Sequence, residues 1–208
     1  MLQINIKGDV YNNKFAINHH KRNKKKLLDE LSTLLINLQS DKHIFKTEPE
    51  KNHQLKVLLQ ISGLLVDEEA KQGRSGSDKN NNYELGNLDI VVFDSENKRK
   101  MLSIIEAFEL NSLGPKNTIV KPHINKLLQN YDTAGNKENY AVIYAKAKNF
   151  DRLWKKYFNY VNNEIFPNES NMKEIEMEKS DLRGGTSLYK RNGKTLSLHH
   201  LFVNMYLE

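Results

Sequence analysis

The chain has 208 residues, a formal net charge of +6, an apolar share of 38% and a charged share of 28%, and it contains no cysteine. Such a length fits one folded domain with a real core, and the lack of cysteine excludes disulfide bonds, thiol catalysis and cysteine-bound zinc. No apolar run reaches the roughly 18 residues of a membrane helix, so we expect no membrane partner. The basic cluster comes too late, after residue 20, for a signal peptide, so we expect a cytoplasmic protein.

The first predicted elements are a small arm and two helices. Residues 1–23 predict a hairpin arm that runs into a basic stretch. Leucines then recur from residue 27 to residue 38 at helical spacing, which predicts an amphipathic helix. After a polar connection at 40–52, apolar residues at helical spacing predict a second helix over about 53–70. A loop rich in glycine, serine and asparagine follows.

Strands alternate with helices in the rest of the chain. Apolar runs at 88–93 and 101–108 predict two neighbouring strands, and a helix is expected over 122–131, with Pro122 in its first turn. A strand at 140–147 precedes a helix that Asn149 is expected to cap. Around Asn192-Gly193 the pattern predicts a terminal hairpin. This order predicts an α/β domain over residues 24–208, with a mixed central sheet flanked by helices.

Two acids interrupt the neighbouring apolar strands at 88–93 and 101–108. Because side chains alternate along a strand, Asp89 shares a face with Val91, and Glu106 shares a face with Phe108. Buried acids of this kind are costly unless they are paired, and two on adjacent strands would repel each other. A Mg²⁺ ion between them would remove the repulsion, since this ion takes one or two protein carboxylates and keeps several waters. Alternatively, each acid pairs with a lysine or lies in water at the end of the sheet.

The stretch from "ELGNLDIVVFD" to "SIIEAFEL" resembles the core of the PD-(D/E)XK nuclease superfamily, which has the restriction-endonuclease-like fold. The resemblance covers about residues 53–147 and implies that Asp89 and Glu106 are the two motif acids that bind Mg²⁺ or Mn²⁺. It also implies a glutamate from the helix before the sheet. Glu69 is the favoured candidate for this third metal ligand, with Glu68 and Glu84 as alternatives.

One position departs from the family pattern. The lysine of the acid-x-Lys motif would stand at Phe108, where it would help to position the attacking water. Some members of the family carry this lysine on another element, and the helix at 122–131 offers Lys126 as the third catalytic residue beside Asp89 and Glu106. His123 lies one turn earlier on the same flank and would contact a phosphate. A plain polar helix face would show the same pattern.

The resemblance implies DNA as the favoured substrate, cut by a metal-activated water. Arg74 and Lys79, in the Gly-rich loop, would contact the phosphate backbone. Residues 123–161 resemble the tail of restriction-endonuclease-like domains in bacterial anti-phage and NTPase-linked proteins, and residues 4–13 resemble short hairpins of bacterial defence proteins, which implies a partner NTPase. The nuclease resemblance also implies a homo-oligomer, since nucleases of this fold often pair. The rival hypothesis is a catalytically inactive module of the same fold that binds nucleic acid, a nucleotide signal or a protein partner. A third hypothesis is a toxin or an assembly subunit.

We do not favour zinc at His19-His20 or His199-His200, since adjacent histidines on a strand point to opposite faces.

Overall fold

A computed structural model of the chain describes residues 25–74, 85–94, 100–132, 135–165 and 170–207. The predicted arm at residues 1–23, and with it the boundary of the main domain, lies outside these residues. So do Lys79 and Glu84, two of the candidate site residues.

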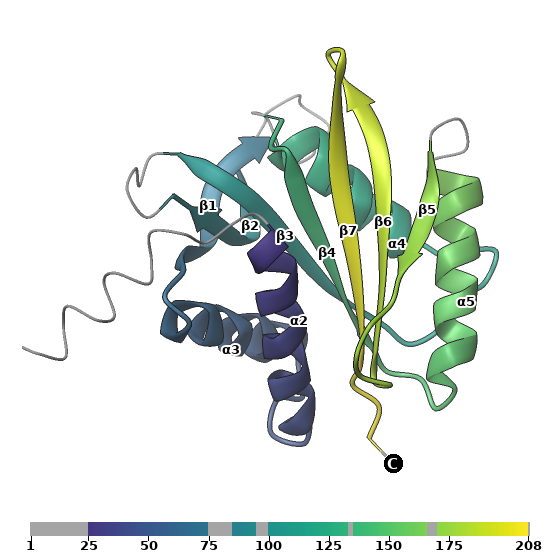
Figure 1. The fold of residues 1–208 in the computed structure, drawn as a ribbon. Coiled ribbons are helices and arrows are strands. Elements are labelled where there is room, and N and C mark those ends of the chain that lie inside the picture. The colour runs from purple at the N-terminus through teal and green to yellow at the C-terminus, as the bar shows by residue number, and fades with distance from the viewer. Residues whose placement is uncertain (1–24, 75–84, 95–99, 133–134, 166–169, 208) are drawn as a thin grey trace, which may run out of the picture.

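The structure contains both helices and strands, as predicted (Figure 1). The helices are α2 (Lys25–Ser40), α3 (Glu48–Ile61), α4 (Val120–Asn125) and α5 (Phe150–Tyr160), with π-helical turns η2 (Lys126–Tyr131) and η3 (Val161–Ile165) directly after α4 and α5. The strands are β1 (Leu65–Arg74), β2 (Leu85–Phe93), β3 (Met101–Leu110), β4 (Glu138–Ala145), β5 (Ser170–Ile175), β6 (Leu182–Arg191) and β7 (Lys194–Asn204).

The described strands form one mixed sheet in the order β1-β2-β3-β4-β7-β6-β5. Strands β1, β2 and β3 form an antiparallel meander. The chain then passes through α4 and η2 to reach β4, which pairs in parallel with β3. Strand β7 pairs in parallel with β4. On its other side β7 pairs with β6, and β6 pairs with β5, both in antiparallel orientation. The predicted α/β class with a mixed sheet is therefore confirmed.

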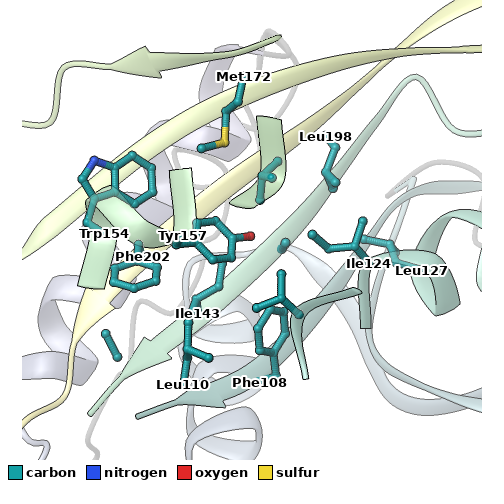
Figure 2. Packing of buried hydrophobic residues seen from close by; sticks show 14 of the residues in the cluster. Phe108, Leu110, Ile124, Leu127, Ile143, Trp154, Tyr157, Met172, Leu198 and Phe202 are labelled. Atoms are coloured by element: carbon teal, nitrogen blue, oxygen red, sulfur yellow. The ribbon is translucent and has the colours of Figure 1, made fainter. Parts of the chain in front are cut away.

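The two faces of the sheet carry separate hydrophobic cores. Helices α2 and α3 pack on one face, where Leu35 and Leu55 meet Ile105 and Val142. Helices α4 and α5, with η2, cover the other face (Figure 1). Figure 2 shows part of this second core, in which residues of α4 and α5 lie against side chains of β3, β4 and β7.

The second predicted helix is wrong in both of its boundaries. Helix α3 begins at Glu48, after a capping box in which the Thr47 hydroxyl accepts from the N–H of Glu50 and the Glu50 carboxylate accepts from the N–H of Thr47. It ends at Ile61, because Gly63 follows with a φ of 86°, which favours glycine and reverses the chain. Residues 65–74 are strand β1, and α3 directly precedes the meander.

The remaining predicted elements are confirmed with small shifts. Asn149 caps α5 by accepting a hydrogen bond from the N–H of Arg152 at 2.9 Å. Asn192 and Gly193 both have positive φ and join β6 to β7. The helix predicted over 122–131 begins at Val120 and turns into the π-helix η2 at Lys126. Strand β5 was not predicted.

Candidate functional site

The meander opens where the two acids of the sequence pattern stand. Pairing between β2 and β3 stops at Ile90 opposite Ile105, whereas pairing between β1 and β2 continues for several residues beyond this point. The next residues, one on each strand, are Asp89 and Glu106. Past the opening, the backbone N–H of Ala107 donates to Asp89 Oδ2 at 2.8 Å, in place of a bond to a neighbouring strand. The sheet therefore separates at this point, and the Asp89 carboxylate takes up an N–H group that the separation leaves free.

Both acids lie on the face of the sheet that α4 covers. Val91, two residues after Asp89, and Phe108, two residues after Glu106, belong to the hydrophobic core on that face. The predicted sharing of faces is thus confirmed for both strands. Glu106 is almost fully buried, and Asp89 is half-buried.

Helix α4 and the start of η2 bring two basic side chains to Glu106. The Nδ1 atom of His123 lies 2.7 Å from Glu106 Oε1, and the ammonium of Lys126 lies 3.9 Å from the same oxygen. The other oxygen, Glu106 Oε2, is buried and has no hydrogen-bond partner among the described residues. A buried carboxylate oxygen without a partner carries a large desolvation penalty, so this atom is the part of the site that most needs a ligand.

The electrostatics of Asp89 reflect the same crowding. The pKa of Asp89 is raised to about 7, mainly by burial and next by the nearby Glu106 carboxylate, while the Ala107 N–H and the Lys126 ammonium act in the opposite direction. Glu48 also raises this pKa by charge repulsion. A carboxyl whose pKa is moved to neutrality by burial and by a second acid is typical of a functional site that receives a cation or a proton.

Phe108 occupies the position of the family lysine and is fully buried. Its ring stacks on the ring of His123, with centroids 4.6 Å apart and 19° between the planes. Lys126 lies near Glu106, with a side chain that is 39% exposed and an ammonium that is 4.7 Å from the centre of the Tyr131 ring. Lys126 is thus partly exposed and stands near Glu106, and its role as the displaced lysine stays a prediction.

The other predicted ligands and contacts are placed differently. Glu69 and Glu68 lie on β1, so the prediction that the helix before the sheet carries them is wrong. Their side chains are not described. Arg74 is the last residue of β1, and its side chain is likewise not described. Lys79 and Glu84 fall outside the described residues.

Glu48 is a further candidate site residue, which the sequence interpretation missed. It stands in the first turn of α3, and its Oε2 accepts a hydrogen bond from the N–H of Glu109 at 2.9 Å. Since α3 is the helix before the sheet, Glu48 is a helix glutamate whose charge acts on Asp89. The capping box Thr47-Glu48-Pro49-Glu50 was the signal that could have found it, because it marks the true start of this helix.

The donor set suits a hard divalent cation. Among the described residues no group of three or more His, Cys, Asp or Glu side chains could by itself hold a metal ion. Two carboxylates, Asp89 and Glu106, are nevertheless enough for Mg²⁺, which keeps several waters and needs one or two protein ligands. The buried Glu106 Oε2 without a partner is the observation that fits such an ion.

The two histidines of β7 are structural. His200 is fully buried, with its Nδ1 2.8 Å from the Tyr157 hydroxyl and its Nε2 3.1 Å from the Ser187 hydroxyl. His199 stacks on Tyr140, which belongs to the core on the opposite face. The prediction that adjacent histidines point to opposite faces is confirmed.

Comparisons with known proteins leave the geometry of the site as the main evidence. No family model, no curated protein and no solved structure matches the chain. In the part of the chain that the structure describes, no helix has both the length and the apolar character needed to cross a membrane.

Proposed function

We propose that the chain is a metal-dependent nuclease with a restriction-endonuclease-like fold, which hydrolyses phosphodiester bonds in DNA. The observation that carries the proposal is the meeting of Asp89 and Glu106 on one face of the sheet, where β2 and β3 separate, with Glu106 Oε2 buried and without a partner among the described residues. Two acids that repel each other in a largely apolar setting are explained by a cation between them.

The order of the elements supports the proposal. Helix α3, the meander β1 to β3, helix α4 and the parallel strand β4 follow one another in the sequence implied by the nuclease resemblance. The first acid stands on the second strand of the meander and the second acid on its third strand, as that resemblance also implies.

The residues of the site have separate tasks in the proposed reaction. Asp89 and Glu106 would hold Mg²⁺ or Mn²⁺, and Glu48 would add negative charge behind them. When bound, such an ion polarises phosphoryl oxygens and makes its water more acidic. Lys126 would balance the charge that builds up on the phosphate in the transition state. Arg74 and Lys79 would contact phosphates along the strand.

Plasmid cleavage with Mg²⁺ or Mn²⁺ tests the proposal. Asp89→Asn and Glu106→Gln keep the size of each side chain and remove its charge, and each should lower the cleavage rate by about 100-fold or more. Glu164→Gln is the matched control, because Glu164 is an exposed acid on η3. Cleavage that persists at the wild-type rate in both site variants would rule out this nuclease site.

The second candidate function is a catalytically inactive module of the same fold that binds nucleic acid, a nucleotide signal or a protein partner. Phe108, in place of the family lysine, and the engagement of Glu106 Oε1 by His123 favour it. It predicts no heat of Mn²⁺ binding in calorimetry and DNA binding that survives Asp89→Ala. The nuclease proposal predicts Mn²⁺ binding that Asp89→Ala removes.

A further inference from the structure

We propose that His123 is a positioning residue for Glu106. Its Nδ1–H group donates to Glu106 Oε1 and so leaves Oε2 as the oxygen that this carboxylate offers to a cation. The inference rests on the proposed function for the identity of the ligand, but the hydrogen bond itself can be tested in the protein without metal. The earlier expectation was a direct contact between His123 and phosphate.

The distances separate His123 from the other basic residue of the site. Nδ1 of His123 lies at 2.7 Å from Oε1, a normal length for a charge-assisted hydrogen bond, whereas the Lys126 ammonium at 3.9 Å is beyond hydrogen-bonding range. In the carboxylate form that would bind a cation, Glu106 can only accept, so in that form Nδ1 carries the proton of this contact. His123 therefore fixes one oxygen of Glu106, and Lys126 supplies only a nearby charge.

The ring of His123 stacks on the ring of Phe108. The two rings stack at 4.6 Å, and Phe108 is fully buried, so the plane of the imidazole is set by the core. Phe108 stands where the family lysine would be, and it is two residues from Glu106 on the same face. The aromatic residue at this position is thus explained as a support for a histidine that arrives from α4.

The consequence is an unequal pair of oxygens on Glu106. Oε1 has two basic groups nearby, and Oε2 has no partner among the described residues although it is buried. Groups that hydrogen-bond to a metal-binding side chain fix its orientation, and their loss typically weakens metal affinity by about 10-fold to 100-fold. His123 should therefore affect the affinity for the cation without contacting it.

Two substitutions at position 123 distinguish a role of Nδ1 from a role of Nε2. In His123→Asn the side-chain amide stands near the place of Nδ1 and can still donate to Glu106, whereas in His123→Gln it stands near the place of Nε2. Titration calorimetry with Mn²⁺ is the readout. We expect His123→Asn to bind Mn²⁺ within about 3-fold of the wild-type Kd and His123→Gln to bind it about 10-fold to 100-fold more weakly. Equal affinities of the Gln variant and the wild type would overturn the inference.

A nitrogen spectrum of the metal-free, full-length protein separates this inference from the proposed function. Two-bond correlations of the His123 ring should show a proton on Nδ1, and its signal should move in Glu106→Gln. A neutral ring protonated on Nε2 alone, or a signal that ignores Glu106→Gln, overturns the positioning role even if the protein cleaves DNA. Conversely, a proton on Nδ1 that responds to Glu106→Gln supports the role even if neither site acid binds Mn²⁺, a result that would remove the nuclease proposal only.

Discussion

Glu48 accepts a hydrogen bond from the backbone N–H of Glu109 at 2.9 Å, so the first turn of α3 is tied to β3 just beyond the point where β2 leaves it. Together with Asp89, which accepts from the N–H of Ala107, it occupies the edge of β3 that a neighbouring strand would otherwise cover. The gap in the sheet is therefore bordered by carboxylates. This arrangement concentrates negative charge at one place, and the charges of Glu106 and Glu48 add to burial, the main cause, in raising the pKa of Asp89.

Glu48→Gln tests whether Glu48 belongs to the cation site. The glutamine oxygen can still accept from the N–H of Glu109, but the negative charge is gone, so we expect the affinity for Mn²⁺ to fall about 10-fold. Titration calorimetry measures the change. Glu50→Gln is the matched control from the same turn, since Gln can replace Glu in a capping box and the exposed Glu50 faces the Thr47 cap. Equal losses in the two variants would mean that Glu48 acts only through general charge.

Asp89→Asn should stabilise the metal-free protein at pH 8. The pKa of Asp89 in the folded protein is about 7, above the ordinary value of 3.8, so its contribution to stability is full below pH 3.8 and is lost as the pH rises through 7. Removing the charge should increase the free energy of unfolding at pH 8 by roughly 2–4 kcal/mol and change it little at pH 4. Urea unfolding at the two pH values measures this. A variant that is less stable than wild type at pH 8 would contradict the proposed crowding.

The sequence allowed the strands of the site and their faces to be predicted, because alternation within two strongly apolar runs is a local signal. Asp89 beside Val91 and Glu106 beside Phe108 follow directly from it. Strand β1 was missed because it is an edge strand of the sheet and carries charged residues. Such residues protect an edge strand from pairing with another chain, but they also interrupt the apolar alternation by which a strand is predicted. The start of α3 was missed because its capping box was interpreted as a polar connection.

The partners of Glu106 could be suggested from the sequence but not assigned. His123 and Lys126 were predicted to share one flank of a helix, which helical spacing indicates. That His123 and not Lys126 makes the hydrogen bond depends on how α4 packs against β3 and on the support from Phe108. Such tertiary packing leaves no trace in local spacing, so the contact between His123 and Glu106 became visible only in the structure.

His200 should make the protein sensitive to acid. The pKa of His200 is lowered from the ordinary value of 6.5 to about 3, mainly by burial and to a smaller extent by the neighbouring His199. A histidine with a depressed pKa contributes stability that is full above pH 6.5 and is lost as the pH falls toward 3, because the unfolded chain binds the proton more tightly. Between pH 7 and pH 4.5 this loss is about 2–3 kcal/mol.

Urea unfolding of wild type and His200→Gln at pH 7 and pH 4.5 checks this expectation. Gln can donate to one hydroxyl and accept from the other in place of the ring, and it does not titrate. The variant should be less stable than wild type at pH 7, but its own loss between the two pH values should be smaller by about 2 kcal/mol. An equal loss in both proteins would show that other groups govern the acid sensitivity.

Lys126→Met tests the displaced lysine of the proposed nuclease. The substitution keeps much of the length of the side chain and its packing on the Tyr131 ring, but it removes the charge 3.9 Å from Glu106. Because Lys126 is expected to balance charge that develops only in the transition state, we expect the DNA cleavage rate to fall about 100-fold, with DNA affinity changed by less than about 3-fold. Lys121→Met, an exposed lysine on α4, is the control and should leave both quantities near wild type. If Lys126→Met and Lys121→Met weaken DNA binding equally and cleavage only in proportion, Lys126 acts as an ordinary surface charge and does not replace the lysine missing at Phe108.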